Sequence, residues 1–192
     1  EEGRWARLFP LFSVIASVSV IILQVTPEAG WDYLLGATYL LYTLLVALYG
    51  VFRFTKRGFV RLEEFVIDIG LIYLSIGGMW FFAHITNINT GFSPIITWLT
   101  AIHFHYTAFL LPIFVGFLGR LYKTRSYTIV AWIIIISPLI LALGITYSVY
   151  IELFSVLLYI VGIYMLIFLS IKTTFSSTLQ KCLIIVSFSS LG

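Results

Sequence analysis

Residues 126–151 read SYTIVAWIIIISPLILALGITYSVYI, and residues 153–171 read LFSVLLYIVGIYMLIFLSI. Neither stretch contains a charged side chain, and Glu152 alone separates them. A helix needs about 20 apolar residues to cross the roughly 30 Å of hydrocarbon in a bilayer. The strands of a membrane barrel are shorter, about 10 residues, and alternate in hydrophobicity. Both stretches therefore predict transmembrane helices.

Four further apolar stretches precede these two, and another begins near the end of the sequence. They cover residues 8–25, 33–52, 65–86 and 93–119, and the last one starts within residues 182–192. Backbone N–H and C=O groups in lipid must find partners within each span, as they do in an α-helix. We expect an all-α polytopic transmembrane helical bundle with six full spans plus the start of a seventh. We also expect residues 1–192 to form a single transmembrane domain and to be part of a longer chain.

The composition agrees with a membrane protein. Of the 192 residues, 61% are hydrophobic and 10% are charged, whereas soluble domains have about 45–50% apolar and about 25% charged residues. A soluble domain of this size has too little interior to hide so much apolar surface. Soluble enzymes and nucleic-acid binders are therefore excluded, and a single cysteine, Cys182, excludes an intramolecular disulfide.

The positions of the basic residues predict the orientation of the chain. All 11 Lys and Arg residues lie before the first span, between spans two and three, between spans four and five, or after span six. The alternate loops contain Glu28, Asp32 and Glu152 as their charged residues. Because cytoplasmic loops of membrane proteins are enriched in Lys and Arg, the N-terminus is predicted to be cytoplasmic. The net charge of +3 is thus a topology signal and gives no reason to expect a nucleic-acid partner.

Three histidines lie inside predicted spans, where ionisable groups are costly and are candidates for function. On a regular helix His103 and His105 point to nearly opposite faces, with Thr100 on the side of His103 and Tyr106 at its edge. Helical rise places His84 at a depth similar to that of His103, so one of the pair can face His84. Such a pair, His84 with His103 or His105, would be the place for a metal, a haem or a proton relay. The alternative is that each histidine only hydrogen-bonds a neighbouring helix.

Asp68 lies about one turn inside the predicted cytoplasmic interface. It is either a proton or cation site, or a carboxylate paired with Arg57 or Arg61, and we favour the ion pair. Glu63 and Glu64 are interpreted as solvated interface charges.

Two backbone features concern helix geometry. Pro112 is predicted to bend its helix and to free a carbonyl about one turn earlier, because proline has no N–H and clashes with the preceding turn. The pair Gly77-Gly78 is predicted to be a point of close helix packing.

The segment GFSP at residues 91–94, followed by LTAIHFHY at residues 99–106, resembles the YndJ-like family of bacterial membrane proteins, which has a similar entry loop and a similar histidine-containing run. The resemblance implies a multi-pass protein of the bacterial cytoplasmic membrane that transports a small solute or an ion. If the motif is functional, the matching positions are Thr100, His103, His105 and Tyr106. His84 and Asp68 lie outside the matched stretch.

The leading hypothesis is therefore a transporter in which His103 and His105 line or gate the pathway. An alternative is an intramembrane enzyme, or a haem or metal protein, that acts on a lipid-soluble substrate. A third is a membrane anchor for the rest of a longer chain. A nucleophile elbow, a phosphate loop, an HExxH motif and paired intramembrane aspartates do not occur in the sequence, which disfavours intramembrane proteolysis of the rhomboid or aspartyl type. The expected partners are the lipid bilayer and a small solute or lipid-soluble ligand; the sequence specifies neither a cofactor nor an oligomeric state.

Overall fold

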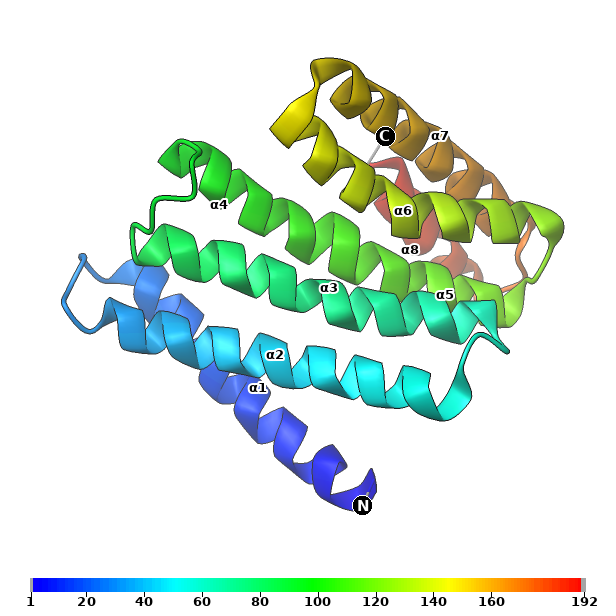
Figure 1. Ribbon diagram of the computed structural model, residues 1–192. Helices are drawn as coiled ribbons and strands as arrows, with labels where there is room; N and C mark the ends of the chain where they lie inside the picture. Colours follow the sequence, from blue (N-terminus) through cyan, green and yellow to red (C-terminus); the bar gives the residue numbers. More distant parts are fainter. Residues whose placement is uncertain (1, 191–192) are drawn as a thin grey trace. The chain divides into compact units, whose positions relative to one another are not determined.

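The computed structural model describes residues 2–190, with side chains from residue 9 onward. These residues form helices and connecting loops, and no strand occurs among them, which confirms the predicted all-α class. The central helix continues without a break from Pro94 to Leu121. The helices in Figure 1 are α1 (Glu2–Val25), α2 (Asp32–Arg57), α3 (Leu62–Ile85), α4 (Pro94–His103), η1 (Phe104–Leu110), α5 (Leu111–Leu121), α6 (Arg125–Tyr147), α7 (Val149–Lys172) and α8 (Thr178–Ser189).

Five helical stretches in the described part of the chain are long and apolar enough to cross a membrane. They are Asp32–Arg57, Leu62–Ile85, Pro94–Leu121, Arg125–Tyr147 and Val149–Lys172, which confirms predicted spans two to six as helices. The first predicted span lies within α1, whose described apolar part is the shorter stretch Phe9–Val25. The predicted seventh span begins within α8, a helix of 12 residues. The total of six full spans and the cytoplasmic N-terminus remain predictions.

Polar side chains mark the starts of several helices. Ser93, Thr124 and Ser177 precede α4, α6 and α8, and each accepts a hydrogen bond from a backbone N–H three residues further on. Such caps satisfy N–H groups that have no partner within the helix. Pro94 follows Ser93 at the first helical position, where its missing N–H costs nothing. Gly58, with φ of 60°, adopts the left-handed conformation that ends α2.

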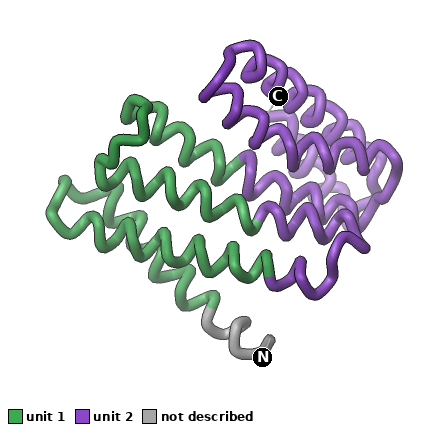
Figure 2. The backbone as a smooth tube through the Cα atoms, in the orientation of Figure 1, with its two compact units in different colours: residues 1–51, 71–106 green, residues 52–70, 107–192 purple. Residues whose placement is uncertain are grey.

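The chain forms two compact units, coloured separately in Figure 2. The first unit contains residues 1–51 and 71–106, and the second contains residues 52–70 and 107–192. Phe81, Phe104 and Ala101 are buried in the first unit. The larger hydrophobic core of the second unit is centred on the fully buried side chains of Val115, Val130, Ile134 and Leu166. All three histidines belong to the first unit, and Asp68 belongs to the second.

A π-helix, η1, directly precedes the turn that contains Pro112. A proline within a helix offers no N–H and clashes with the preceding turn, and π-turns are one way in which helices accommodate such an irregularity. The carbonyl of Thr107, five residues before Pro112, accepts a hydrogen bond from the Tyr159 hydroxyl of α7 at 3.1 Å. The carbonyl of Thr107 thus has a side-chain partner on α7. The bend and the freed carbonyl at Pro112 stay predictions, and the π-helix was not predicted.

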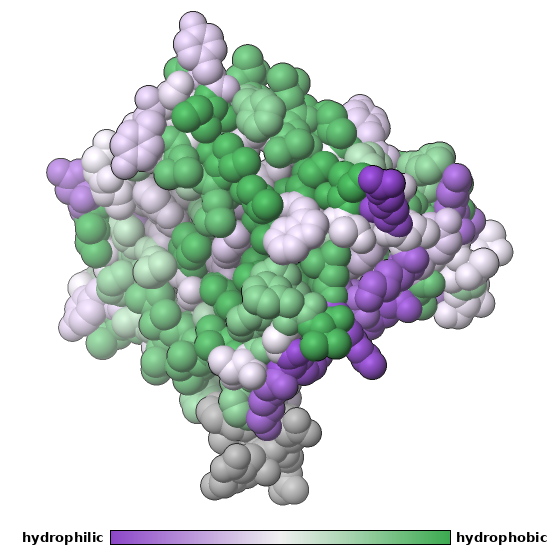
Figure 3. All heavy atoms as spheres, turned by 45° about the vertical axis from the view of Figure 1, so that its right-hand side comes forward, coloured by the Kyte–Doolittle hydropathy of each residue, from purple (hydrophilic) through white to green (hydrophobic). Residues whose placement is uncertain are grey.

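The described surface carries many large apolar side chains. On α7 these include Leu153, Phe154, Leu157, Tyr164 and Phe168, each more than half exposed. Figure 3 shows hydrophobic residues over most of the visible face and hydrophilic residues in limited patches. Extended apolar surface of this kind is typical of contact with a membrane.

Candidate functional site

A cavity of about 360 Å³ lies in the first unit, at the end of α1, the start of α2 and the end of α3. Small-molecule sites in proteins commonly have volumes of about 300–1,000 Å³. Most of the lining residues are polar, which is unusual for a protein so rich in apolar residues. The lining consists of Leu23, Gln24, Thr26, Glu28, Asp32, His84, Ile85, Asn87 and Trp98.

Of the two carboxylate oxygens of Asp32, one receives a hydrogen bond from the described residues and the other does not. Its Oδ2 accepts a hydrogen bond from the backbone N–H of Ala29 at 2.9 Å. Its Oδ1 is buried, and no described residue donates to it. Asp32 is the first residue of α2, where the helix dipole stabilises a negative charge. The lining of the cavity thus includes a carboxylate with one oxygen that receives no hydrogen bond from the described residues.

Among the side chains of the first unit that the structure describes, the formally charged ones lie at this cavity. Residues 9–51 and 71–106, the part of the unit with described side chains, contain no Lys or Arg. Their two formally charged residues are Glu28 and Asp32, and both line the cavity. The cavity is therefore negative, and no basic side chain in this part of the unit compensates for it.

A series of ring contacts leads from the cavity into the interior of the first unit. The ring of His84 lies 4.9 Å from that of Trp98, and Trp98 lies 5.9 Å from Phe81, measured between ring centroids. Phe81 packs edge-on against Tyr39 at 5.2 Å, and Tyr39 stacks on His105 at 5.7 Å. Continuous aromatic packing thus connects a histidine of the cavity wall with a histidine of the predicted motif.

His105 is held by hydrogen bonds at both ring nitrogens. Its Nδ1 lies 2.7 Å from the carbonyl oxygen of Ala101, and its Nε2 lies 2.5 Å from the hydroxyl of Tyr39. Because a carbonyl can only accept, Nδ1 carries the proton, and in the neutral ring Nε2 accepts from Tyr39. Gly77 leaves room for the ring: a Cβ at this position would lie 2.8 Å from Nδ1. This agrees with the predicted close packing at Gly77-Gly78.

The other residues of the predicted motif lie in different surroundings. The Thr100 hydroxyl donates to the carbonyl of Ile96 in its own helix at 2.8 Å, and Tyr106 is 61% exposed. The ring of His103 lies edge-on to Phe104 at 6.0 Å. Among the four motif positions, His105 is thus the one that the ring contacts connect to the cavity.

The structure separates His84 from His105. Gly77, which packs on His105, is seven residues before His84 on α3, which corresponds to about 10 Å of helical rise. Within the described residues there is no group of three or more His, Cys, Asp or Glu side chains that could hold a metal ion. The ring of His84 packs against Trp98, whereas that of His105 packs against Tyr39. The pairing of His84 with His103 or His105 in one site stays a prediction.

Tyr39, Trp98 and Asp32 were not predicted as site residues from the sequence. Tyr39 is one of 12 tyrosines, and nothing in its local sequence distinguishes it. Asp32 and Glu28 were interpreted as topology signals alone. Their isolation was visible, however, because no other charged residue occurs between residues 8 and 52.

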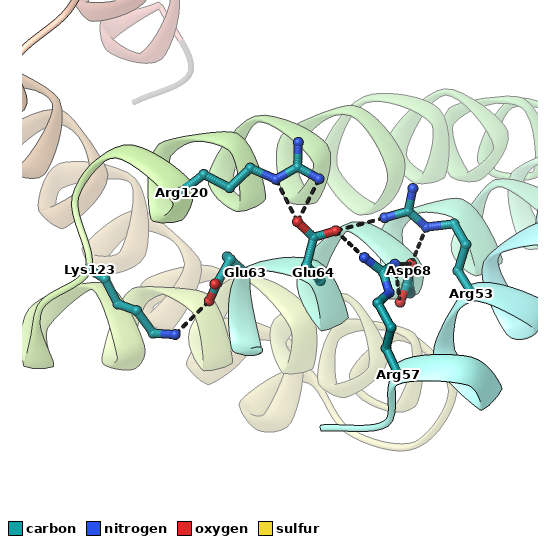
Figure 4. Close-up of polar contacts among 7 residues, drawn as sticks. All are labelled: Arg53, Arg57, Glu63, Glu64, Asp68, Arg120 and Lys123. Atoms are coloured by element: carbon teal, nitrogen blue, oxygen red, sulfur yellow. Dashed lines mark hydrogen bonds and ion pairs between the residues drawn. The ribbon is translucent and has the colours of Figure 1, made fainter. Parts of the chain in front are cut away.

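In the second unit, Asp68 belongs to an ionic cluster, shown in Figure 4. Its side chain is 1% exposed and accepts from Arg53 Nε at 2.6 Å and from Arg57 Nη2 at 3.1 Å. Glu64 accepts from Arg53 at 2.9 Å, from Arg57 at 2.5 Å and from Arg120 at 2.6 Å. The cluster ties together the ends of α2 and α5 and the start of α3.

These contacts decide between the interpretations made for the acidic residues. The pairing of Asp68 with Arg57 is confirmed, and its second partner is Arg53, not Arg61. Glu63 and Glu64 are 9% and 8% exposed, so their interpretation as solvated charges was wrong. Glu63 is paired with Lys123 at 2.8 Å. Basic side chains from other segments of the second unit thus contact each of these buried carboxylates.

Comparisons with known proteins agree with the apolar helices. The family model described as YndJ-like protein matches residues 1–192. The chain is 38% identical over 176 residues to a protein of Bacillus subtilis (strain 168) named "Uncharacterized membrane protein YndJ", and the alignment covers 90% of this chain and 32% of that protein. The chain thus spans about a third of the length of this relative. No solved structure matches the chain.

Proposed function

Because the chain belongs to the YndJ-like family and is an integral membrane protein, we propose that it moves a small solute or an ion across the bilayer. The observation that carries this proposal is the cavity of the first unit, with its polar lining and its unpartnered Asp32 oxygen. A polar cavity next to spans that are otherwise apolar favours solute binding over a purely structural role. The proposed location is the bacterial cytoplasmic membrane, with the N-terminus in the cytoplasm.

His105 is the motif residue to which we assign a role in the pathway. Its ring exchanges hydrogen bonds with Tyr39 and Ala101, and the ring contacts continue from Tyr39 to the cavity wall. A neutral imidazole that accepts at one nitrogen and donates at the other reverses one of these bonds when it takes up a proton. His105 with Tyr39 therefore forms a gate whose closed form is the hydrogen-bonded pair.

The test is uptake by vesicles that contain the purified protein. Initial uptake rates of ¹⁴C-labelled guanidinium, urea and acetate are measured, and the rates of protein-free vesicles are subtracted. We expect at least one of the three solutes to enter faster with the protein, and both His105→Gln and Tyr39→Phe to reduce that rate at least about tenfold, which corresponds to about 1.4 kcal/mol.

Tyr33→Phe is the matched control, since Tyr33 lies on the same helix as Tyr39 and is 55% exposed. Uptake by this variant should equal that of the wild type. Equal rates with and without protein for all three solutes contradict the proposed function. Uptake that survives both His105→Gln and Tyr39→Phe contradicts the role of the gate.

A further inference from the structure

We propose that the solute is a small organic cation with N–H donors, bound in the cavity of the first unit between the Asp32 carboxylate and the ring of Trp98. This inference rests on the proposed function and specifies its substrate class. Three features of the cavity support it: its charge, the hydrogen-bonding capacity of its lining, and its aromatic wall.

The charge of the cavity selects against anions. Glu28 and Asp32 line it, and residues 9–51 and 71–106 contain no Lys or Arg to balance them. An anion in this cavity would approach two carboxylates without a counter-charge from residues 9–51 and 71–106, whereas a cation would neutralise one of them. In a site partly shielded from water, this difference is larger than it would be at an open surface.

The hydrogen-bonding capacity of the lining selects for a donor. Asp32 Oδ1 is buried and receives no hydrogen bond from the described residues, and an unsatisfied buried carboxylate oxygen is costly. An ammonium or guanidinium N–H satisfies this oxygen with a charge-assisted hydrogen bond. A quaternary ammonium has the charge and lacks the donor.

The aromatic wall favours an organic cation over a metal ion. Trp98 and His84 both line the cavity, and their rings lie 4.9 Å apart. Indole is the aromatic ring that attracts cations most strongly, and a planar guanidinium stacks well on it. Metal ions need several converging ligands, and no suitable group of three exists among the described residues.

The experiment compares solutes of similar shape and different charge. The purified protein in detergent is titrated calorimetrically with guanidinium, with its neutral analogue urea, with acetate and with tetramethylammonium. We expect guanidinium to bind at least about tenfold more tightly than each of the other three probes, a difference of about 1.4 kcal/mol. A guanidinium affinity no higher than that of urea, or no guanidinium binding up to millimolar concentrations, would overturn the inference.

Two substitutions locate the binding to the cavity. Asp32→Asn should weaken guanidinium binding at least tenfold, because the amide keeps an oxygen for the Ala29 N–H but loses the charge. Glu152→Gln is the matched control, since Glu152 is also an acidic residue in the first turn of a helix and lies in the second unit. It should leave binding unchanged. An Asp32→Asn variant with wild-type affinity would overturn the inference.

The outcomes for the two proposals can be told apart. Urea or acetate binding that His84→Gln weakens would overturn the cation inference and leave solute transport standing. Vesicles that take up none of the solutes contradict transport itself, whatever the calorimetry shows.

Discussion

Replacing Asp68 by Asn should destabilise the protein strongly, because Asp68 is a nearly fully buried carboxylate between two arginines. It accepts from Arg53 Nε at 2.6 Å and from Arg57 Nη2 at 3.1 Å. The amide side chain has the same shape and removes the negative charge. The Arg53 and Arg57 guanidinium groups then face a neutral group that can accept at one oxygen only.

The expected magnitude follows from burial. Removing one partner of a buried ion pair costs about 3–5 kcal/mol. Both arginines, however, keep their contacts with Glu64, and the Arg57 side chain is 36% exposed and can be partly hydrated. We therefore expect a loss of about 2–3 kcal/mol in the free energy of unfolding, below the full cost of a buried pair.

Unfolding in sodium dodecyl sulfate, followed by far-ultraviolet circular dichroism, measures this loss. Glu63→Gln is the matched control, because Glu63 has a single ionic partner, Lys123, whose side chain is 53% exposed. Because water reaches Lys123 although Glu63 is buried, we expect Glu63→Gln to cost about 1 kcal/mol. If Asp68→Asn cost no more than Glu63→Gln, the reasoning from burial would be refuted.

Two further substitutions test helix packing by the same unfolding measurement. Gly78→Ala should lower the free energy of unfolding by about 1–3 kcal/mol, because the added Cβ would overlap the buried Thr43 side chain. The control Gly30→Ala has nothing within 4 Å of the added carbon and should stay within about 0.5 kcal/mol of the wild type. Equal effects of the two substitutions would contradict the packing argument. Tyr159→Phe should cost about 1 kcal/mol because its hydroxyl donates to a π-helix carbonyl, and the control Tyr164→Phe, 59% exposed, should cost less than half of this. A neutral Tyr159→Phe would show that this carbonyl is satisfied without the hydroxyl.

The spans were predictable because their signal is local. A helix in lipid requires an uninterrupted apolar run, and such runs placed the five helices long enough to cross a membrane. An irregularity near Pro112 was predictable, since proline lacks the N–H that a regular helix needs. The form of the irregularity was not, because a helix can accommodate proline by a bend or by a π-turn.

The ionic cluster of the second unit was predictable from the sequence only in part. The acidic and basic residues of the cluster were all visible in the sequence, and Arg57 was named as a partner of Asp68. The choice of Arg53 over Arg61, and the burial of Glu63 and Glu64, depend on which helix faces α3 and on the rotation of each helix about its axis. Those rotations are set by the packing of many side chains together.

The candidate site, like the ionic cluster, was predictable from the sequence only in part. Three properties follow from the sequence alone: the all-helical membrane fold, the histidines inside its spans, and the isolated negative charges Glu28 and Asp32. Each is carried by single residues and their neighbours in the chain. The tertiary structure decided that His105 meets Tyr39, that His84 meets Trp98, and that both carboxylates line one cavity. These contacts join residues far apart in the sequence, so they exist only once the helices have packed.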